Sequence, residues 1–228
     1  MFLLIVLTCL TNSFAQQPLV TTDTLTSVQV TELFPGTVRK SFNINFPIYR
    51  VYRYSDKSGQ YYCVLTESRD VITADNDTFN YKIKAINLKV NKGSLTKVWE
   101  FSDNIVKNVN DELTIWFWTK YTDFKDFDND NLIDPIVIYG TSNGFRDGRI
   151  KFFIYYKGRK IAIRHQNASL DFVRETQVDK GFYDLPQSIQ AAIKQKMELM
   201  TENEHAIFPA GWETDMKNKK TFFSEREQ

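Results

Sequence analysis

The sequence DFDNDNLIDP, residues 126–135, lies between two strongly apolar, strand-like runs. It places acidic side chains at positions 1, 3, 5 and 9 of a loop, and alternate residues of a tightly wound loop direct their side chains toward one centre. Calcium takes about six to eight oxygen ligands from carboxylates and backbone carbonyls, so we predict a Ca²⁺ site here. The predicted ligands are the carboxylates of Asp126, Asp128, Asp130 and Asp134 and the backbone carbonyl of Leu132.

The backbone of such a loop turns sharply at position 6, where calcium loops usually carry glycine. The residue here is Asn131, and asparagine tolerates a left-handed backbone better than most other residues. Ile133 is expected to point inward as an apolar anchor. Pro135 drives the residue before it into an extended conformation, so the loop should lead directly into a strand.

Two other interpretations of the acidic pattern compete with a calcium loop of this kind. An EF-hand would carry a bidentate glutamate on a helix at position 12, but that position is Val137, inside an apolar strand-like run. The second alternative is a solvated acidic turn. Two carboxylates about 4 Å apart repel by roughly 4 kcal/mol at an effective dielectric constant of about 20, which a bound cation or an open loop would relieve.

The segment 126–137 resembles the calcium loop of FG-GAP/VCBS-type repeats, which run D-F-D-G-D-G-x-x-D and continue into a strand. Both glycines of that motif are asparagine in this chain, at Asn129 and Asn131. Those families repeat the unit around a propeller. This sequence contains one copy, so the resemblance implies the loop and not a complete propeller.

The composition indicates one substantial hydrophobic core. The chain has 228 residues, 42% of them hydrophobic and 14% aromatic, which favours a β-rich protein. Its formal net charge is +1, and no basic run stands out, so nucleic acid is not an expected partner.

The first fifteen residues have the pattern of a secretory signal peptide, with an apolar run and a small-residue cleavage site that ends at Ala15. Cleavage there removes Cys9 and leaves Cys63 as the remaining thiol, expected to be buried, and leaves no transmembrane segment. Lipidation at Cys9 and an amino-terminal core strand are the alternatives. We therefore expect export to the periplasm or the cell surface.

Period-two alternation predicts a mainly β fold of antiparallel hairpins in a meander, with turns at residues 56–59, 91–93 and 157–159. A change of phase within 79–90 suggests a bulge, and the run 113–118, apolar on both faces, suggests a central strand.

Apolar side chains at helical spacing predict one carboxy-terminal amphipathic helix over about 186–204, packed on the sheet. The expected organisation is a signal peptide at 1–15, an exposed lead-in at 16–30, a single β-rich domain at 31–213 and a charged tail at 214–228.

The sequence gives little support to an enzyme. Its two histidines, His165 and His205, do not lie in zinc-ligand spacing, and no nucleophile elbow, phosphate loop or dinucleotide fingerprint occurs. A glycan-cleaving hydrolase remains an alternative, because its two carboxylates can come from distant strands. Candidates by residue type are Glu67, Glu100 and Glu112.

Two aromatic groups have open interpretations. Trp116 and Trp118 share one face of a strand and form either core or a platform on which sugars stack. The apolar turn 208–212 is the candidate contact loop if the protein is instead a periplasmic inhibitor or immunity protein.

The order of features resembles a family of exported bacterial surface-polysaccharide biosynthesis proteins: signal peptide, tyrosine-rich hairpins, Trp116-Phe117-Trp118, the acidic loop, Tyr139-Gly140-Thr141 and the helix start Leu185-Pro186. The resemblance implies a role in lipopolysaccharide or capsule production and assigns no catalytic residue. We therefore expect a calcium-stabilised, non-catalytic β-domain protein whose partner is an envelope glycan or an envelope protein.

Overall fold

The computed structural model describes residues 20–106, 111–145 and 147–227. The predicted signal peptide, Cys9 and the first part of the expected lead-in therefore lie outside the described residues.

The fold is mainly β, with antiparallel sheets and a carboxy-terminal helix, as predicted. In the first sheet the strands follow the order β1 (Thr21–Thr24), β2 (Ile48–Asp56), β3 (Gly59–Glu67), β6 (Lys82–Asn91) and β7 (Ser94–Asn104). In the second sheet the order is β14 (Phe222–Ser224), β13 (Glu175–Val178), β12 (Arg159–Asn167), β11 (Gly148–Tyr156), β10 (Asp134–Ser142) and β8 (Thr114–Phe117), and β9 (Asp123–Lys125) also pairs with β10. A separate ribbon consists of β4 (Val71–Ile72) and β5 (Thr78–Phe79).

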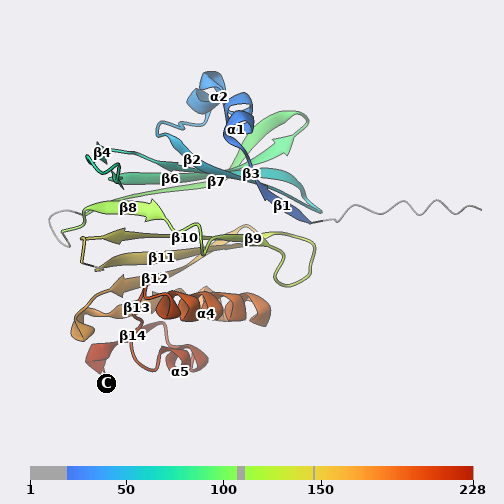
Figure 1. The fold of residues 1–228 in the computed structure, drawn as a ribbon. Helices are drawn as coiled ribbons and strands as arrows, with labels where there is room; N and C mark the ends of the chain where they lie inside the picture. Colours follow the sequence, from blue (N-terminus) through green and yellow to red (C-terminus); the bar gives the residue numbers. More distant parts are fainter. Residues whose placement is uncertain (1–19, 107–110, 146, 228) are drawn as a thin grey trace, which may run out of the picture.

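The two sheets stack face to face, and helices cover their outer faces, so the molecule has four layers (Figure 1). The first sheet is covered by α1 (Ser27–Leu33) and α2 (Gly36–Ser41), and the second by α4 (Gln187–Glu202) and α5 (Trp212–Lys217). The helix expected over about 186–204 is α4. Short 3₁₀ turns are η1 (Asp171–Val173), η2 (Lys180–Asp184) and η3 (Glu225–Glu227).

The middle of the second sheet is buried on both faces, which explains the apolar runs 136–139 in β10 and 152–155 in β11. In β10, Ile136 and Ile138 pack toward the helices, while Val137 and Tyr139 pack toward the first sheet. The helical side of this core includes the apolar stripe of α4, whose residues Ile189, Ile193, Met197 and Met200 are fully buried. The stripe thus follows the predicted helical spacing.

Aromatic pairs fill the space between the sheets. The rings of Trp99 and Tyr155 stack with centroids 3.8 Å apart, and Phe101 meets Phe153 edge to face at 4.7 Å. Cys63, at the centre of β3, is fully buried, and burial raises the pKa of its thiol well above the usual range. It is therefore a structural residue, as its sequence setting predicts.

The change of phase in β6 has a different cause from the predicted one. Ile83 and Ala85 face the second sheet, whereas Ile86 and Leu88 face α1 and α2. All four side chains are fully buried. Both faces of this strand are therefore apolar. A bulge does occur in the β6–β7 pair, but the extra residue is Val98 of β7, between the partners of Asn87 and Leu88.

The run 113–118, expected as a central strand, lies at the edge of the second sheet. Its strand, β8, pairs with β10 alone in the sheet order. Ile115 and Phe117 enter the core between the sheets, while Trp116 and Trp118 face the other way and stay half-buried. The run is apolar on both faces because its second face lines a cleft.

The segments on either side of the expected domain also take part in the fold. Strand β1 in the expected lead-in is exposed along its length yet pairs with β2, and Leu25 after it is buried. In the expected charged tail, β14 pairs with β13 and buries Phe223. Because charged residues dominate this segment in sequence, its two buried apolar side chains, Met216 and Phe223, were not predicted.

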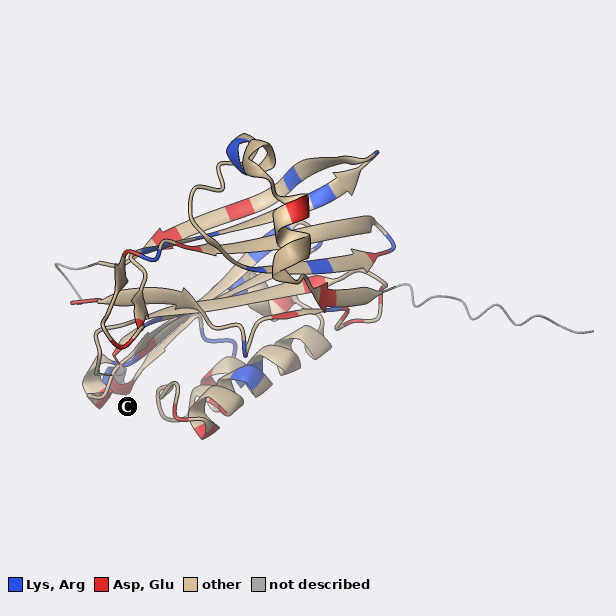
Figure 2. Ribbon diagram, turned by 45° about the horizontal axis from the view of Figure 1, so that its top comes forward, with Lys and Arg blue, Asp and Glu red and all other residues tan. Residues whose placement is uncertain are grey.

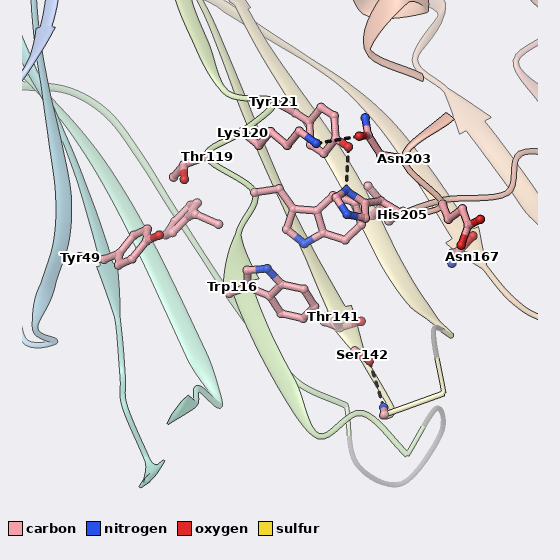
Figure 3. Close-up of a pocket in the computed structure, with 15 residues that line it drawn as sticks. Tyr49, Trp116, Thr119, Lys120, Tyr121, Thr141, Ser142, Asn167, Asn203 and His205 are labelled. Atoms are coloured by element: carbon pink, nitrogen blue, oxygen red, sulfur yellow. Dashed lines mark hydrogen bonds between the residues drawn. The ribbon is translucent and has the colours of Figure 1, made fainter. Parts of the chain in front are cut away.

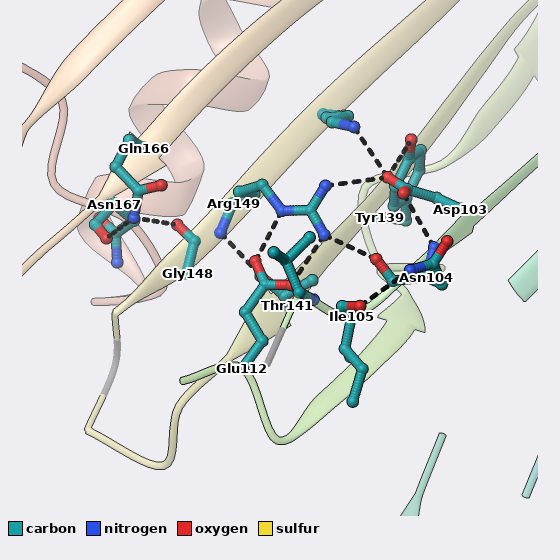
Figure 4. A network of polar contacts seen from close by, with 12 residues as sticks. Asp103, Asn104, Ile105, Glu112, Tyr139, Thr141, Gly148, Arg149, Gln166 and Asn167 are labelled. Atoms are coloured by element: carbon teal, nitrogen blue, oxygen red, sulfur yellow. Dashed lines mark hydrogen bonds and ion pairs between the residues drawn. The ribbon is translucent and has the colours of Figure 1, made fainter. Parts of the chain in front are cut away.

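A partly buried polar network joins the two sheets (Figure 4). Arg149 of β11 binds Glu112 through two hydrogen bonds of 2.6 and 2.8 Å and contacts Asp103 of β7 at 3.3 Å. Asp103 also accepts hydrogen bonds from Lys151 at 2.8 Å and from the hydroxyl of Tyr139 at 3.1 Å. Burial alone would raise the pKa values of both carboxyls, but these hydrogen bonds outweigh it and hold them lowered.

The approach of β10 to β11 beside this network leaves no room for a side chain at Gly148. A Cβ there would lie 2.0 Å from the carbonyl oxygen of Thr141. We predict that Gly148→Ala lowers the free energy of unfolding by at least about 2 kcal/mol. Gly36→Ala is the matched control, because a Cβ at Gly36 meets nothing within 4 Å. It should be neutral or stabilise by up to about 1 kcal/mol. Urea unfolding compares the two, and equal stabilities would contradict the packing described here.

Candidate functional site

The acidic loop closes the β9–β10 hairpin at one end of the sandwich and holds the turns of both sheets together. The backbone N–H of Lys57, in the β2–β3 turn, donates to the carbonyl of Asn131 at 3.0 Å. The N–H of Ile133 donates to the Asp56 carboxylate at 3.1 Å. From the β11–β12 hairpin, the hydroxyl of Tyr156 donates to Asp128 at 3.0 Å. The loop therefore connects three chain reversals.

Three of the predicted ligands meet. One carboxylate oxygen each from Asp126, Asp128 and Asp130 lies within 4.8 Å of the others, and all three side chains are half-buried. Among the described residues this is the one cluster of its kind. The three carboxylates could hold a metal ion.

The backbone of the loop is left-handed at Asn131, as predicted, and also at Asn129. Asn129 has φ 60° and Asn131 has φ 64°, so asparagine fills both places where the resembling motif has glycine. Backbone N–H groups bind the carboxylates and fix their direction: those of Asp130 and Asn131 donate to Asp126 at 3.1 and 2.8 Å. The tight winding thus follows from local hydrogen bonds.

Two lysines also reach the cluster. Lys157 lies 2.9 Å from the Asp130 carboxylate, and the Lys57 ammonium donates to the backbone carbonyl of Asp130. The hydrogen bond from Lys157 lowers the pKa of Asp130. These exposed ammonium groups offset part of the negative charge and would move aside with little loss when a cation binds.

Asp134 stands apart from the cluster of three. Its side chain is 2% exposed and accepts a 3.0 Å hydrogen bond from the N–H of Phe127. Its pKa is raised to about 7, chiefly by burial and also by the negative charges of the other three aspartates, against the lowering effect of the Phe127 hydrogen bond. Its role as a ligand, like that of the Leu132 carbonyl, stays a prediction. Ile133 is buried between the sheets as the predicted anchor.

A cleft of about 680 Å³ lies beside β8, between the start of β2 and the end of α4 (Figure 3). Trp116 and Trp118 form part of its wall, with ring centroids 5.8 Å apart. Gly140 makes room for this arrangement, because a Cβ there would lie 3.0 Å from the Trp118 ring. The two tryptophans are therefore neither pure core nor freely exposed.

Contacts between two separate segments, 118–121 and 203–205, hold one side of the cleft together. The hydroxyl of Tyr121 lies 2.7 Å from Nδ1 of His205, and the His205 ring lies edge-on to Trp118 at 6.1 Å. Lys120 donates to the side-chain carbonyl of Asn203 at 2.8 Å. Sequence analysis treats His205 and the tryptophans as separate candidates. Their contact in space could not be predicted, because more than eighty residues separate them in the chain.

The predicted hydrolase residues do not form a catalytic pair in this cleft. Glu67 is buried against the N–H of Phe117, Glu112 binds Arg149, and Glu100 forms ion pairs on the outer face. Among the described lining residues, Glu204 is the one acid.

The remaining candidates have structural places. Phe208 and Trp212, expected in an exposed contact loop, are buried in the core beneath the second sheet at 5% and 6% exposure. His165 is 2% exposed, with Nδ1 3.0 Å from the Thr176 hydroxyl. The apolar turn therefore packs inward, and its aromatic rings fill part of the core between the second sheet and α5.

No protein-family model, curated protein or solved structure matches this chain. None of the helices in the described ranges combines the length and the apolar run that crossing a bilayer requires.

The burial of His165 generates a prediction about acid stability. Burial lowers its pKa from 6.5 to about 4, so the folded protein keeps this ring neutral while the unfolded chain protonates it. Its contribution to stability is therefore complete above about pH 6.5 and is lost as the pH falls toward 4. NMR titration of the histidine ring protons should show His165 titrating near pH 4. A midpoint near 6.5 in the folded protein would contradict this assignment.

Proposed function

We propose that this chain is an exported, calcium-stabilised, non-catalytic β-domain protein that supports the assembly or maintenance of cell-surface polysaccharide. The observation that carries the calcium part is the convergence of Asp126, Asp128 and Asp130 at the point where turns of both sheets meet. A cation bound there would act as a structural clip between the sheets.

The donor chemistry favours calcium over other metals. The cluster consists of carboxylates alone, which are ligands for hard cations, whereas zinc and copper favour cysteine and histidine. Magnesium requires a near-ideal octahedron, and calcium accepts the variable geometry of a wound loop. In the proposed site Asp134 and the carbonyl of Leu132 complete the shell.

The proposed clip is weak enough to suit a compartment where calcium is abundant. Extracellular calcium modules bind with Kd of about 10⁻⁴ to 10⁻³ M. At about 1 mM calcium, mass action then adds roughly 0.4 to 1.4 kcal/mol to the free energy of unfolding. The signal-peptide pattern of residues 1–15 supports export to the periplasm or the cell surface.

The glycan part of the proposal is supported by the resemblance to exported surface-polysaccharide biosynthesis proteins. The non-catalytic part is supported by the described lining of the cleft, in which Glu204 is the one acid. A glycosidase would need two carboxylates about 5 to 9.5 Å apart. An envelope glycan or an envelope protein is the proposed partner.

The calcium site predicts cation-specific stabilisation. Calcium at 1 mM should raise the melting temperature by about 1 to 5 °C, and magnesium should raise it less. Combined replacement of Asp126, Asp128 and Asp130 by asparagine should remove the calcium-dependent increment, whatever it does to the starting stability. The matched control is Asp23→Asn, which breaks an exposed ion pair with Arg53 on β2 and should keep the increment. Calorimetry that shows neither a shift nor binding heat would refute the site.

The envelope role predicts a phenotype. Deleting the gene in its host should change the lipopolysaccharide or capsule profile on gels, and the intact gene supplied in trans should restore it. The triple asparagine variant should restore it less well, because its domain lacks the clip. Unchanged glycan profiles in the deletion strain would count against this role.

A further inference from the structure

We infer that the cleft beside β8 binds a neutral oligosaccharide, with one sugar ring stacked on the indole of Trp116. The inference names the ligand class for the proposed glycan role and rests on that proposal. It uses residues of the cleft and none of the acidic loop.

Trp116 and Trp118 both line the cleft, and the ring of Trp118 packs against Tyr121 and His205 at 6.2 and 6.1 Å. Trp99 stacks on Tyr155 at 3.8 Å and Trp212 is 6% exposed, so packing accounts for both. Trp116 stays half-buried in the wall of the cleft. The face of an indole is electron-rich and attracts the weakly positive C–H groups that line one side of a pyranose ring.

A second aromatic ring lies across the cleft. Tyr49 at the start of β2 is 48% exposed, and in Figure 3 Trp116 lies between it and the group formed by His205 and Asn167. At the other end, Gly144 lines the cleft, and its neighbour Phe145 is 78% exposed. Aromatic rings therefore line part of the cleft, and a further exposed ring lies just beyond its Gly144 side.

The polar groups of the cleft suit an uncharged ligand. Hydroxyl and carboxamide groups both donate and accept hydrogen bonds, as sugar hydroxyls do. Such groups among the lining residues come from Tyr49, Thr119, Thr141, Ser142, Asn167 and Asn203.

Charge is sparse in the described lining, which holds one lysine and one glutamate. The Lys120 ammonium already binds Asn203 at 2.8 Å. An acidic glycan would need a free cationic group, so a neutral one fits better.

The size and stiffness of the cleft agree with this ligand. About 680 Å³ falls within the roughly 300 to 1,000 Å³ of small-molecule sites and suits about two or three sugar rings. Two features hold the wall in place without a ligand. The ring of Trp118 packs on Gly140 of β10, and the hydroxyl of Tyr121 is hydrogen-bonded to His205. Preorganisation of this kind reduces the entropy lost on binding.

The test is an array of neutral di- to tetrasaccharides of hexoses and N-acetylhexosamines, with uronic-acid and sialylated glycans for comparison. Isothermal titration with the best neutral probe then gives the affinity of the purified protein. We expect saturable binding of at least one neutral glycan, and recovery of that glycan uncleaved. Trp116→Ala should weaken binding at least tenfold, and Trp116→Phe should retain part of it.

The matched control is Phe172→Ala, which removes an aromatic ring that is 53% exposed on η1, outside the cleft, and should leave the affinity within about twofold. If Trp116→Ala does not fold, Tyr49→Ala takes its place with the same expectation. No neutral glycan bound on the array, or an affinity unchanged by folded cleft variants, would overturn the inference. Retained glycan binding alongside a normal envelope in the deletion strain would instead refute the envelope role and leave the cleft assignment intact.

Discussion

Mutual repulsion among Asp126, Asp128 and Asp130 is the constraint on which the end of the sandwich depends. Their oxygens lie within 4.8 Å of one another, where each pair of full charges costs several kcal/mol at the effective dielectric constant of a protein surface. Backbone N–H groups and the ammonium of Lys157 relieve part of this cost. The same loop binds the β2–β3 turn through the carbonyl of Asn131 and the N–H of Ile133, so the conformation of the loop also affects how the two sheets meet.

The second sheet carries both the acidic loop and one wall of the cleft. Its middle strands are covered on both faces, by the first sheet and by α4, so their positions are fixed by burial. At its edge, β8 keeps one face in the core and leaves the other beside the cleft. Rigid strands thus support the clip at one end and the aromatic wall at the edge. This division matches the proposed role, in which calcium stabilises the domain and the cleft binds an oligosaccharide.

Local chemistry made much of this predictable from sequence. Helical spacing located α4, turn residues located the hairpins, and Asn131 marked its left-handed turn. The predictions that were wrong depend on which segments lie next to a strand, and the local sequence does not record this. An apolar run on both faces reads as central, yet β8 is an edge strand, because Trp116 lines a cleft. The cleft itself joins residues near 49, 118, 142 and 205, and no local pattern records that meeting.

The central claim is that the three carboxylates share one calcium ion. Its most direct test is a crystal structure grown with calcium, with anomalous data collected to locate the ion. One anomalous peak is expected about 2.3 to 2.6 Å from oxygens of Asp126, Asp128 and Asp130, with Lys157 displaced from Asp130. A map with no peak in the loop, and Lys157 still paired with Asp130, would contradict it.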